Sequence, residues 1–211
     1  MAGIEVTENE LAEILGKKGQ ESRWVTAIAG PPAAGKSTLV TKVAQVLNDA
    51  DPGSAAILPM DGFHYDNAIL DARGWRPRKG APHTFDVAGF GHMLGRLRRN
   101  DETEVAAPVF DRKLELGRNC AQIIPQSVRH LLVEGNYLLL DQAPWSDLAP
   151  LFDTTVFIEV PIDVLRDRLV QRWRNYPEDE ALRKMNENDL PNGRKVVEHS
   201  RGADYILNYS G

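Results

Sequence analysis

Short, almost continuous apolar segments recur along the chain, at 23–29, 55–58, 131–134 and 154–160. Runs of this length without alternating polar residues are typical of strands that are buried on both faces of a sheet. A weaker segment at 204–207 predicts one more strand near the end of the chain. We therefore expect a sheet whose central strands lie between two layers of other elements.

Between these segments, apolar residues recur every three or four positions, which is the spacing of an amphipathic helix. This pattern predicts helices at about 36–49, 87–100, 162–174 and 192–199. Strands that alternate with helices need crossover connections, so the chain is predicted to form an α/β fold with a mainly parallel sheet. In the helix at 36–49 the predicted apolar stripe comprises Leu39, Val43, Val46 and Leu47.

Residues 1–20 are predicted to hold an additional N-terminal helix. Thr7 and Glu10 have the spacing of a capping box, and Val6 and Leu11 have the spacing of a hydrophobic staple around the same cap. The sequence therefore predicts that this helix begins directly after Thr7.

The composition is that of an ordinary globular protein, with 42% hydrophobic and 26% charged residues. A length of 211 residues is within the range of one core, so 1–211 is expected to be a single domain. The net charge of −5 argues against a protein whose main task is to bind nucleic acid. The single Cys120 cannot form an internal disulfide, and the chain lacks a signal-peptide layout and a long apolar run. We therefore expect a cytoplasmic protein without membrane insertion.

Residues 30–38 match the phosphate-binding pattern GxxxxGK[ST]. They follow a predicted buried strand and begin a predicted helix, where backbone N–H groups can surround phosphate oxygens. Lys36 can reach the terminal phosphates, and the Ser37 hydroxyl can bind Mg²⁺. No guanine-specific Asn-Lys-x-Asp string occurs, so ATP is favoured. The predicted nucleotide-binding residues here are Gly30, Ala33, Ala34, Gly35, Lys36, Ser37 and Thr38.

Two predicted strands end on carboxylates, the first on Asp61 and the second on Glu134. The carboxyl ends of parallel strands gather around the ligand crevice, so both side chains are expected near the phosphates. Asp61 can accept the proton of an attacking hydroxyl or hold magnesium through water. Glu134 ends an apolar run, where a charge needs a partner such as Mg²⁺-bound water. A structural role at a strand end stays open for each of them.

Residues 62–84 show little periodicity, and a loop of this length in a compact domain is usually functional or disordered. The segment has a net charge of +2 and interleaved aromatic residues. It is expected to lie over a polar or anionic acceptor, although a solvated loop has the same composition. Arg78 and His83 are its candidate acceptor contacts.

Four arginines occur on the helix predicted at 162–174. Guanidinium groups beside a transferring phosphoryl group stabilise its negative charge. The alternative is a solvated helix face on which the arginines pair with neighbouring aspartates. The four residues are Arg166, Arg168, Arg172 and Arg174.

Taken together, these motifs resemble the small P-loop kinases of the phosphoribulokinase, uridine kinase and bacterial pantothenate kinase group. Within it, the chain is similar in particular to a bacterial branch called fructose transport system kinase. The strings that carry the resemblance are the loop at 30–38, Met60-Asp61-Gly62-Phe63, Arg78-Lys79-Gly80, Thr84-Phe85-Asp86, Pro108-Val109-Phe110, Val133-Glu134-Gly135, Asn188-Asp189-Leu190-Pro191 and Arg201-Gly202-Ala203-Asp204.

The resemblance implies a three-layer α/β/α fold, ATP and Mg²⁺ as cofactors, and a small lid at about 166–190. It also implies roles for single residues, namely Asp61 as the base, Lys36 and Ser37 at phosphate and Mg²⁺, Glu134 near the metal, Arg172 in the lid, Arg201 and Gly202 beside adenine, and Phe110 and Asn188 at the acceptor.

The main hypothesis is a kinase that phosphorylates a hydroxyl of a small polar metabolite, such as a sugar or nucleoside. A nucleotide-binding regulatory protein or a slow ATPase linked to transport is the first alternative, and a nucleotide-monophosphate kinase is another. Pantothenate is disfavoured, because Asp111-Arg112 replaces the Ser-His pair of pantothenate kinases and Phe110 replaces their tyrosine. A homodimer stays open, since no apolar seam predicts one.

Overall fold

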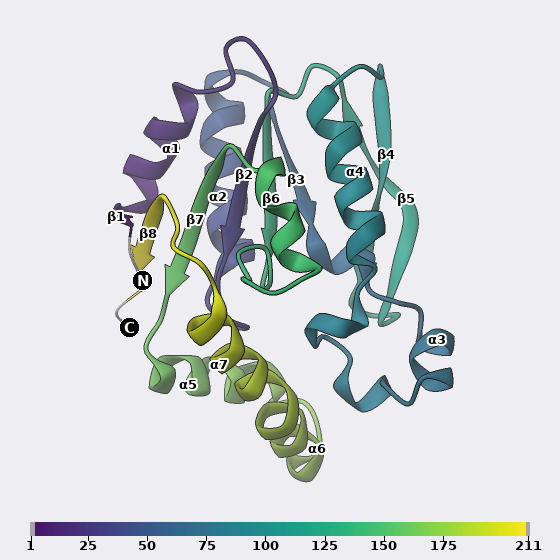
Figure 1. Ribbon diagram of the computed structural model, residues 1–211. Helices are drawn as coiled ribbons and strands as arrows, with labels where there is room; N and C mark the ends of the chain where they lie inside the picture. The colour runs from purple at the N-terminus through teal and green to yellow at the C-terminus, as the bar shows by residue number, and fades with distance from the viewer. Residues whose placement is uncertain (1–2, 210–211) are drawn as a thin grey trace.

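A parallel six-stranded sheet with the order β1-β8-β7-β2-β6-β3 organises the computed structural model, which describes residues 3–209 (Figure 1). A separate two-stranded antiparallel hairpin, β4-β5, lies beside it. The α/β class and the parallel sheet are therefore confirmed. The strands are β1 (Ile4–Glu5), β2 (Trp24–Ala29), β3 (Ala55–Pro59), β4 (Glu104–Asp111), β5 (Leu116–Pro125), β6 (His130–Gly135), β7 (Thr154–Glu159) and β8 (Tyr205–Asn208).

Helices cover both faces of the sheet, and α5, α6 and α7 gather below the carboxyl ends of its central strands (Figure 1). The α-helices are α1 (Glu8–Gly16), α2 (Lys36–Ala50), α3 (Asn67–Ala72), α4 (Val87–Arg99), α5 (Ile162–Trp173), α6 (Glu178–Arg183) and α7 (Leu190–His199). Shorter turns of helix are the 3₁₀ segments η1 (Met60–Phe63), η2 (Arg76–Arg78), η3 (Pro82–Thr84) and η4 (Trp145–Leu151), and the π-helical η5 (Lys184–Asp189).

The alternation of side chains along the strands divides the core into two layers. On β2, Val25 and Ala27 pack with α4 and η4, whereas Ile28 packs with α1 and α2. On β6, Leu131 faces the first layer and Leu132 the second. Because the side chains on both faces of these strands are buried, each strand is a continuous apolar run in the sequence.

The capping box of α1 is present, since the Thr7 side chain accepts from the backbone of Glu10 and the Glu10 carboxylate accepts from the backbone of Thr7. The expected position of Val46 on the apolar stripe is wrong, because 49% of this residue is exposed. Within 62–84, the apparently irregular segment contains α3 and two 3₁₀ turns. Among residues 3–209, no helix combines the length and the apolar character that a bilayer span requires.

The β4-β5 hairpin has no counterpart among the predicted elements. Pro108 lies inside β4 next to a register shift, and Cys120 interrupts β5 with a φ of 51°. These breaks disturb the period-2 pattern by which a half-buried strand is recognised. The hairpin matters for the site, because it brings Phe110 and Arg112 to the carboxyl end of the sheet.

Replacing Arg23 by Met is expected to lower the free energy of unfolding by about 2–4 kcal/mol. The residue Arg23 is 4% exposed, and its guanidinium donates to the carbonyl oxygens of Leu97, Pro125 and Val128, at 2.9, 2.7 and 2.8 Å. Urea unfolding measures the change. The control Arg99→Met removes an exposed arginine and is expected to stay within about 0.5 kcal/mol. An Arg23→Met protein as stable as the Arg99→Met control would contradict the proposed contribution of the Arg23 hydrogen bonds to stability.

Candidate active site

The phosphate-binding loop connects the end of β2 to the start of α2, as its sequence context requires. Ala33 and Gly35 have φ values of 64° and 100°, the left-handed conformation that curls a short loop tightly. A side chain at Gly30 would meet the carbonyl oxygen of Ile158 at 3.1 Å, so the close approach to β7 favours glycine there. Arg168, on α5, contacts the loop by donating to the carbonyl oxygen of Ala34 at 3.2 Å.

Lys36, at the first position of α2, is buried and donates its ammonium protons to the loop itself. Its Nζ lies 3.0 Å from the carbonyl oxygen of Gly30 and 2.9 Å from that of Pro31. Burial lowers the pKa of Lys36 to about 8, although the charges of Glu134 and Asp61 act in the opposite direction. A positive charge held in so poorly hydrated a place is suited to binding a polyanion such as a triphosphate.

Glu134 and Ser37 supply the oxygen donors expected of a magnesium site. The Ser37 hydroxyl donates to Glu134 Oε1 at 3.4 Å. Burial raises the pKa of Glu134, and the neighbouring Lys36 charge lowers it. Mg²⁺ in kinases is held by one or two carboxylates together with nucleotide phosphates, and its ligands are hard oxygens. The side chains present therefore fit this ion.

Asp61 lies in η1, two residues beyond the end of β3, so the expectation that it ends the strand is corrected by one short turn. This turn passes close to β6, where a side chain at Gly135 would meet the Cβ of Met60 at 2.6 Å. The close packing explains the pairing of Glu134 with a following glycine. It also brings the Asp61 carboxylate into the cavity that Lys36 lines.

A cavity of about 580 Å³ unites these groups. The phosphate loop, η1, η2, the hairpin, α5, η5 and α7 all contribute side chains to it. Its lining includes Lys36, Ser37, Thr38, Asp61, Glu134, Phe110, Asn188 and Arg172 among the residues selected from the sequence.

The lid region predicted at about 166–190 consists of α5, α6 and η5. Arg172 lines the cavity from α5, and its guanidinium lies 5.2 Å from the centre of the Trp173 ring. Trp173 in turn donates to the carboxylate of Asp189 at 2.6 Å, and burial raises the pKa of Asp189. These contacts connect the end of α5 to the π-helical turn, so the two segments pack as a unit.

Arg78 and Asn188, both predicted to contact an acceptor, also contact each other. Arg78 Nε donates to Asn188 Oδ1 at 3.3 Å, and Arg78 Nη2 donates to Asn192 Oδ1 at 3.3 Å. Asn188 donates to the carbonyl oxygen of Lys79 at 2.7 Å. This cluster joins η2 to η5 and α7 across one edge of the cavity, and the predicted acceptor contacts of both residues stay a prediction.

Six selected residues do not line the cavity, namely Gly30, Ala34, Arg78, His83, Arg201 and Gly202. His83 packs edge-on against Trp75, with ring centres 5.0 Å apart. Arg201 and Gly202 follow α7, where the Arg201 backbone donates to the carbonyl oxygen of Leu139 at 2.9 Å. Their expected roles at acceptor and adenine stay predictions, since no contact described above tests them.

The cavity also contains residues to which the sequence analysis assigned no role in the site. His64 lies between Phe85 and Phe110, with ring centres 4.0 and 4.8 Å apart, and burial lowers its pKa. Lys79 and Arg112 also line the cavity, with Arg76. Had β4 been recognised as a strand, the spacing of two residues between Phe110 and Arg112 would have placed Arg112 on the same face as Phe110.

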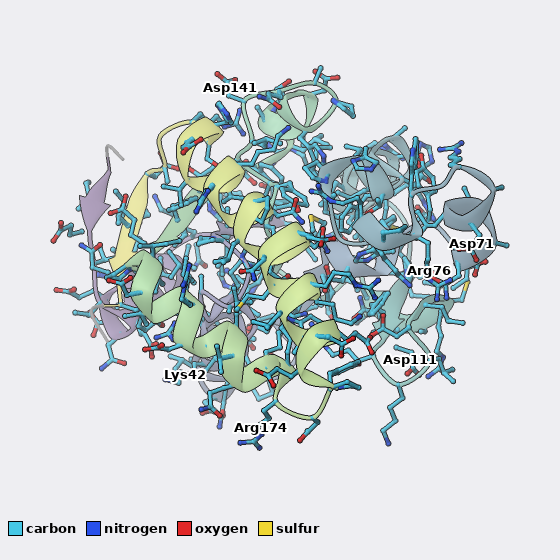
Figure 2. The ribbon with its side chains drawn as sticks, turned by 90° about the horizontal axis from the view of Figure 1, so that it is seen from below. Lys42, Asp71, Arg76, Asp111, Asp141 and Arg174 are labelled. Atoms are coloured by element: carbon cyan, nitrogen blue, oxygen red, sulfur yellow. The ribbon has the colours of Figure 1, made fainter. Side chains whose placement is uncertain are left out.

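Figure 2 views this end of the molecule, with α5 and the helices that follow it in front. Asp71 and Arg76 lie together near α3, and Asp111 lies on the same side at the end of the hairpin. Lys42, on α2, and Arg174, at the end of α5, lie away from these residues.

No family model matches the chain. "Uncharacterized protein YggC" of Escherichia coli (strain K12) is 38% identical over 195 residues, which is 89% of this chain and 78% of that protein. "Putative uridine kinase C227.14" of Schizosaccharomyces pombe is 32% identical over 208 residues, which is 94% of this chain and 87% of that protein.

A solved structure from Silicibacter sp. TM1040, described as a "putative fructose transport system kinase", matches with a TM-score of 0.87 and 37% identity. The match covers 95% of this chain and 98% of that one. The chain therefore belongs to the P-loop kinases of the uridine and pantothenate kinase group, which are phosphotransferases that act on small molecules.

Proposed function

We propose that the protein transfers the terminal phosphoryl group of ATP, with Mg²⁺, to a hydroxyl of a small polar metabolite such as a sugar or nucleoside. The observation that carries the proposal is that Lys36 and Asp61 line the same cavity. A phosphate-binding cation and a carboxylate of an acceptor-side turn are the two groups that such a transfer needs. Residues 1–211 would act as one cytoplasmic kinase domain.

In the proposed reaction, the acceptor hydroxyl oxygen attacks the terminal phosphorus, and the bond from this phosphorus to the bridging oxygen breaks. The Asp61 carboxylate takes the proton of the hydroxyl. Lys36 and Arg172 stabilise the negative charge that spreads over the phosphoryl oxygens. Bound Mg²⁺, with Ser37 and Glu134 as its protein donors, would neutralise phosphate charge. The lid excludes water, which would otherwise compete as acceptor.

The test is ADP release in the presence of ATP, Mg²⁺ and single acceptors from a panel of neutral and acidic compounds, namely D-fructose, D-ribose, uridine, D-gluconate, D-ribose 5-phosphate and pantothenate. At least one sugar or nucleoside is expected to raise ADP release well above the rate without acceptor. Phosphorylated product, detected by mass spectrometry, must accompany the increase. ADP release that no acceptor raises would favour the slow-ATPase alternative and contradict the kinase proposal.

A further inference from the structure

On the acceptor side of the cavity, the lining cations Arg76, Lys79 and Arg112 outnumber the lining carboxylates Asp61 and Glu115. Lys79 directly follows η2, Arg112 directly follows β4, and both line the cavity together with Phe110. The Lys79 ammonium lies 5.2 Å from the centre of the Phe110 ring, and Arg112 follows Phe110 by two residues. Since these cations lie on the side of Asp61 and not in the phosphate loop, they concern the acceptor.

Lys79 has neutral partners. Its Nζ donates to Asn67 Oδ1 at 2.7 Å and to the backbone carbonyl oxygen of Glu115. Burial lowers the pKa of Lys79, and the charges of Glu115 and Asp66 counteract this, although neither carboxylate forms an ion pair with it in the described chain. A half-buried ammonium bound only by neutral oxygens retains the capacity to bind an anion.

Arg112 has one weak acidic partner, which is the proposed base. Its Nη2 lies 3.5 Å from Asp61 Oδ2, and 63% of the side chain is exposed. An ion pair at this distance and exposure contributes little, so the guanidinium can exchange Asp61 for a better-placed anion. Such an exchange would leave Asp61 free to accept a proton from the acceptor.

The packing of the β4-β5 hairpin on η1 fixes the position of Arg112. A side chain at Gly62 would meet the carbonyl oxygen of Pro108 at 2.6 Å, and one at Gly117 would meet the carbonyl oxygen of Gly62 at 2.7 Å. Both strands of the hairpin therefore pack directly on the turn that carries Asp61. The backbone beside Arg112 cannot move away from Asp61 without losing this contact.

From this arrangement we infer that the acceptor carries an acid group, a carboxylate or a phosphate, in addition to its reacting hydroxyl, and that Lys79 and Arg112 bind that group. The inference rests on the proposed kinase function. It narrows the acceptor from polar metabolites in general to anionic ones. In this proposal Arg112 binds the acid group of the acceptor. Its contact with Asp61 is then lost only when an acceptor is present, which frees Asp61 to act as the base.

Matched acceptors test the inference. We would measure kcat/KM for D-ribose, D-ribonate and D-ribose 5-phosphate, and for D-glucose, D-gluconate and D-glucose 6-phosphate. At least one anionic member is expected to exceed its neutral parent by about 10- to 100-fold, which is the range of a charge-assisted hydrogen bond. Preference for the carboxylate or for the phosphate member identifies the acid group.

The variants Arg112→Gln and Lys79→Gln are expected to remove most of this preference, mainly through a higher KM. Lys113→Gln changes the neighbouring exposed lysine, which does not line the cavity, and is expected to retain the preference. Arg112 is exposed, so its substitution keeps the test valid if Lys79→Gln fails to fold. Neutral parents that react as well as their acids, or a preference that survives in Arg112→Gln, would overturn the inference and leave the kinase proposal standing. Failure of every acceptor to raise ADP release would overturn both.

Discussion

Asp61→Asn is expected to lower kcat by about 10²–10⁴-fold, the range of a positioned general base. Asparagine keeps the size of the side chain and its place in η1 but cannot take a proton from the acceptor. The Kd of ATP is expected to change by only a few-fold, because the nucleotide phosphates are assigned to the loop that follows β2. Steady-state kinetics with the best acceptor and calorimetric titration of ATP measure the two effects.

The matched control for this variant is Asp141→Asn, which changes an exposed aspartate outside the cavity and is expected to behave as the wild type. Unfolding by urea should show nearly equal stability for all three proteins, since the 3.5 Å contact of Asp61 with Arg112 is partly exposed. A kcat within about three-fold of the wild type would remove Asp61 from the proposed reaction, whatever the acceptor is.

Lys36→Met is expected to lower kcat by about 10²–10³-fold and to weaken ATP binding, because it removes a preorganised cation from the phosphate site. The same change is expected to stabilise the protein without nucleotide at pH 7. Burial of the ammonium lowers its pKa to about 8, so the charged form costs free energy in the folded state. The size of this effect is about 3 kcal/mol at most.

The pH dependence separates this effect from a packing change. Between about pH 8 and 10.5 the unfolded protein binds more protons at Lys36 than the folded protein, so wild-type stability from this group rises with pH. The stability advantage of Lys36→Met should therefore shrink from pH 7 to pH 10. Lys42→Met on the same helix, which removes an exposed lysine, provides the control. A Lys36→Met protein less stable than wild type at pH 7, or an advantage independent of pH, would contradict the burial argument.

A strand can be predicted from the sequence when its pattern of apolar residues is unbroken over adjacent positions. The strands at 24–29 and 130–135 were predictable because both faces are buried, which makes their apolar runs continuous. The β4-β5 hairpin was not, because Pro108 and the positive φ of Cys120 break its alternation. For the same reason, the approach of Arg112 to Asp61 across 51 residues had no signature in the sequence.

The sequence by itself determined the α/β class, the phosphate loop and the presence of carboxylates at or near the ends of two strands, since each follows from residues adjacent in the chain. Only the tertiary structure decided that Asp61, Lys79 and Arg112 line one cavity, and that Arg78 and Asn188 contact each other. The physical reason is that close packing, such as that of Gly62 and Gly117 between η1 and the hairpin, brings distant segments together through shape complementarity.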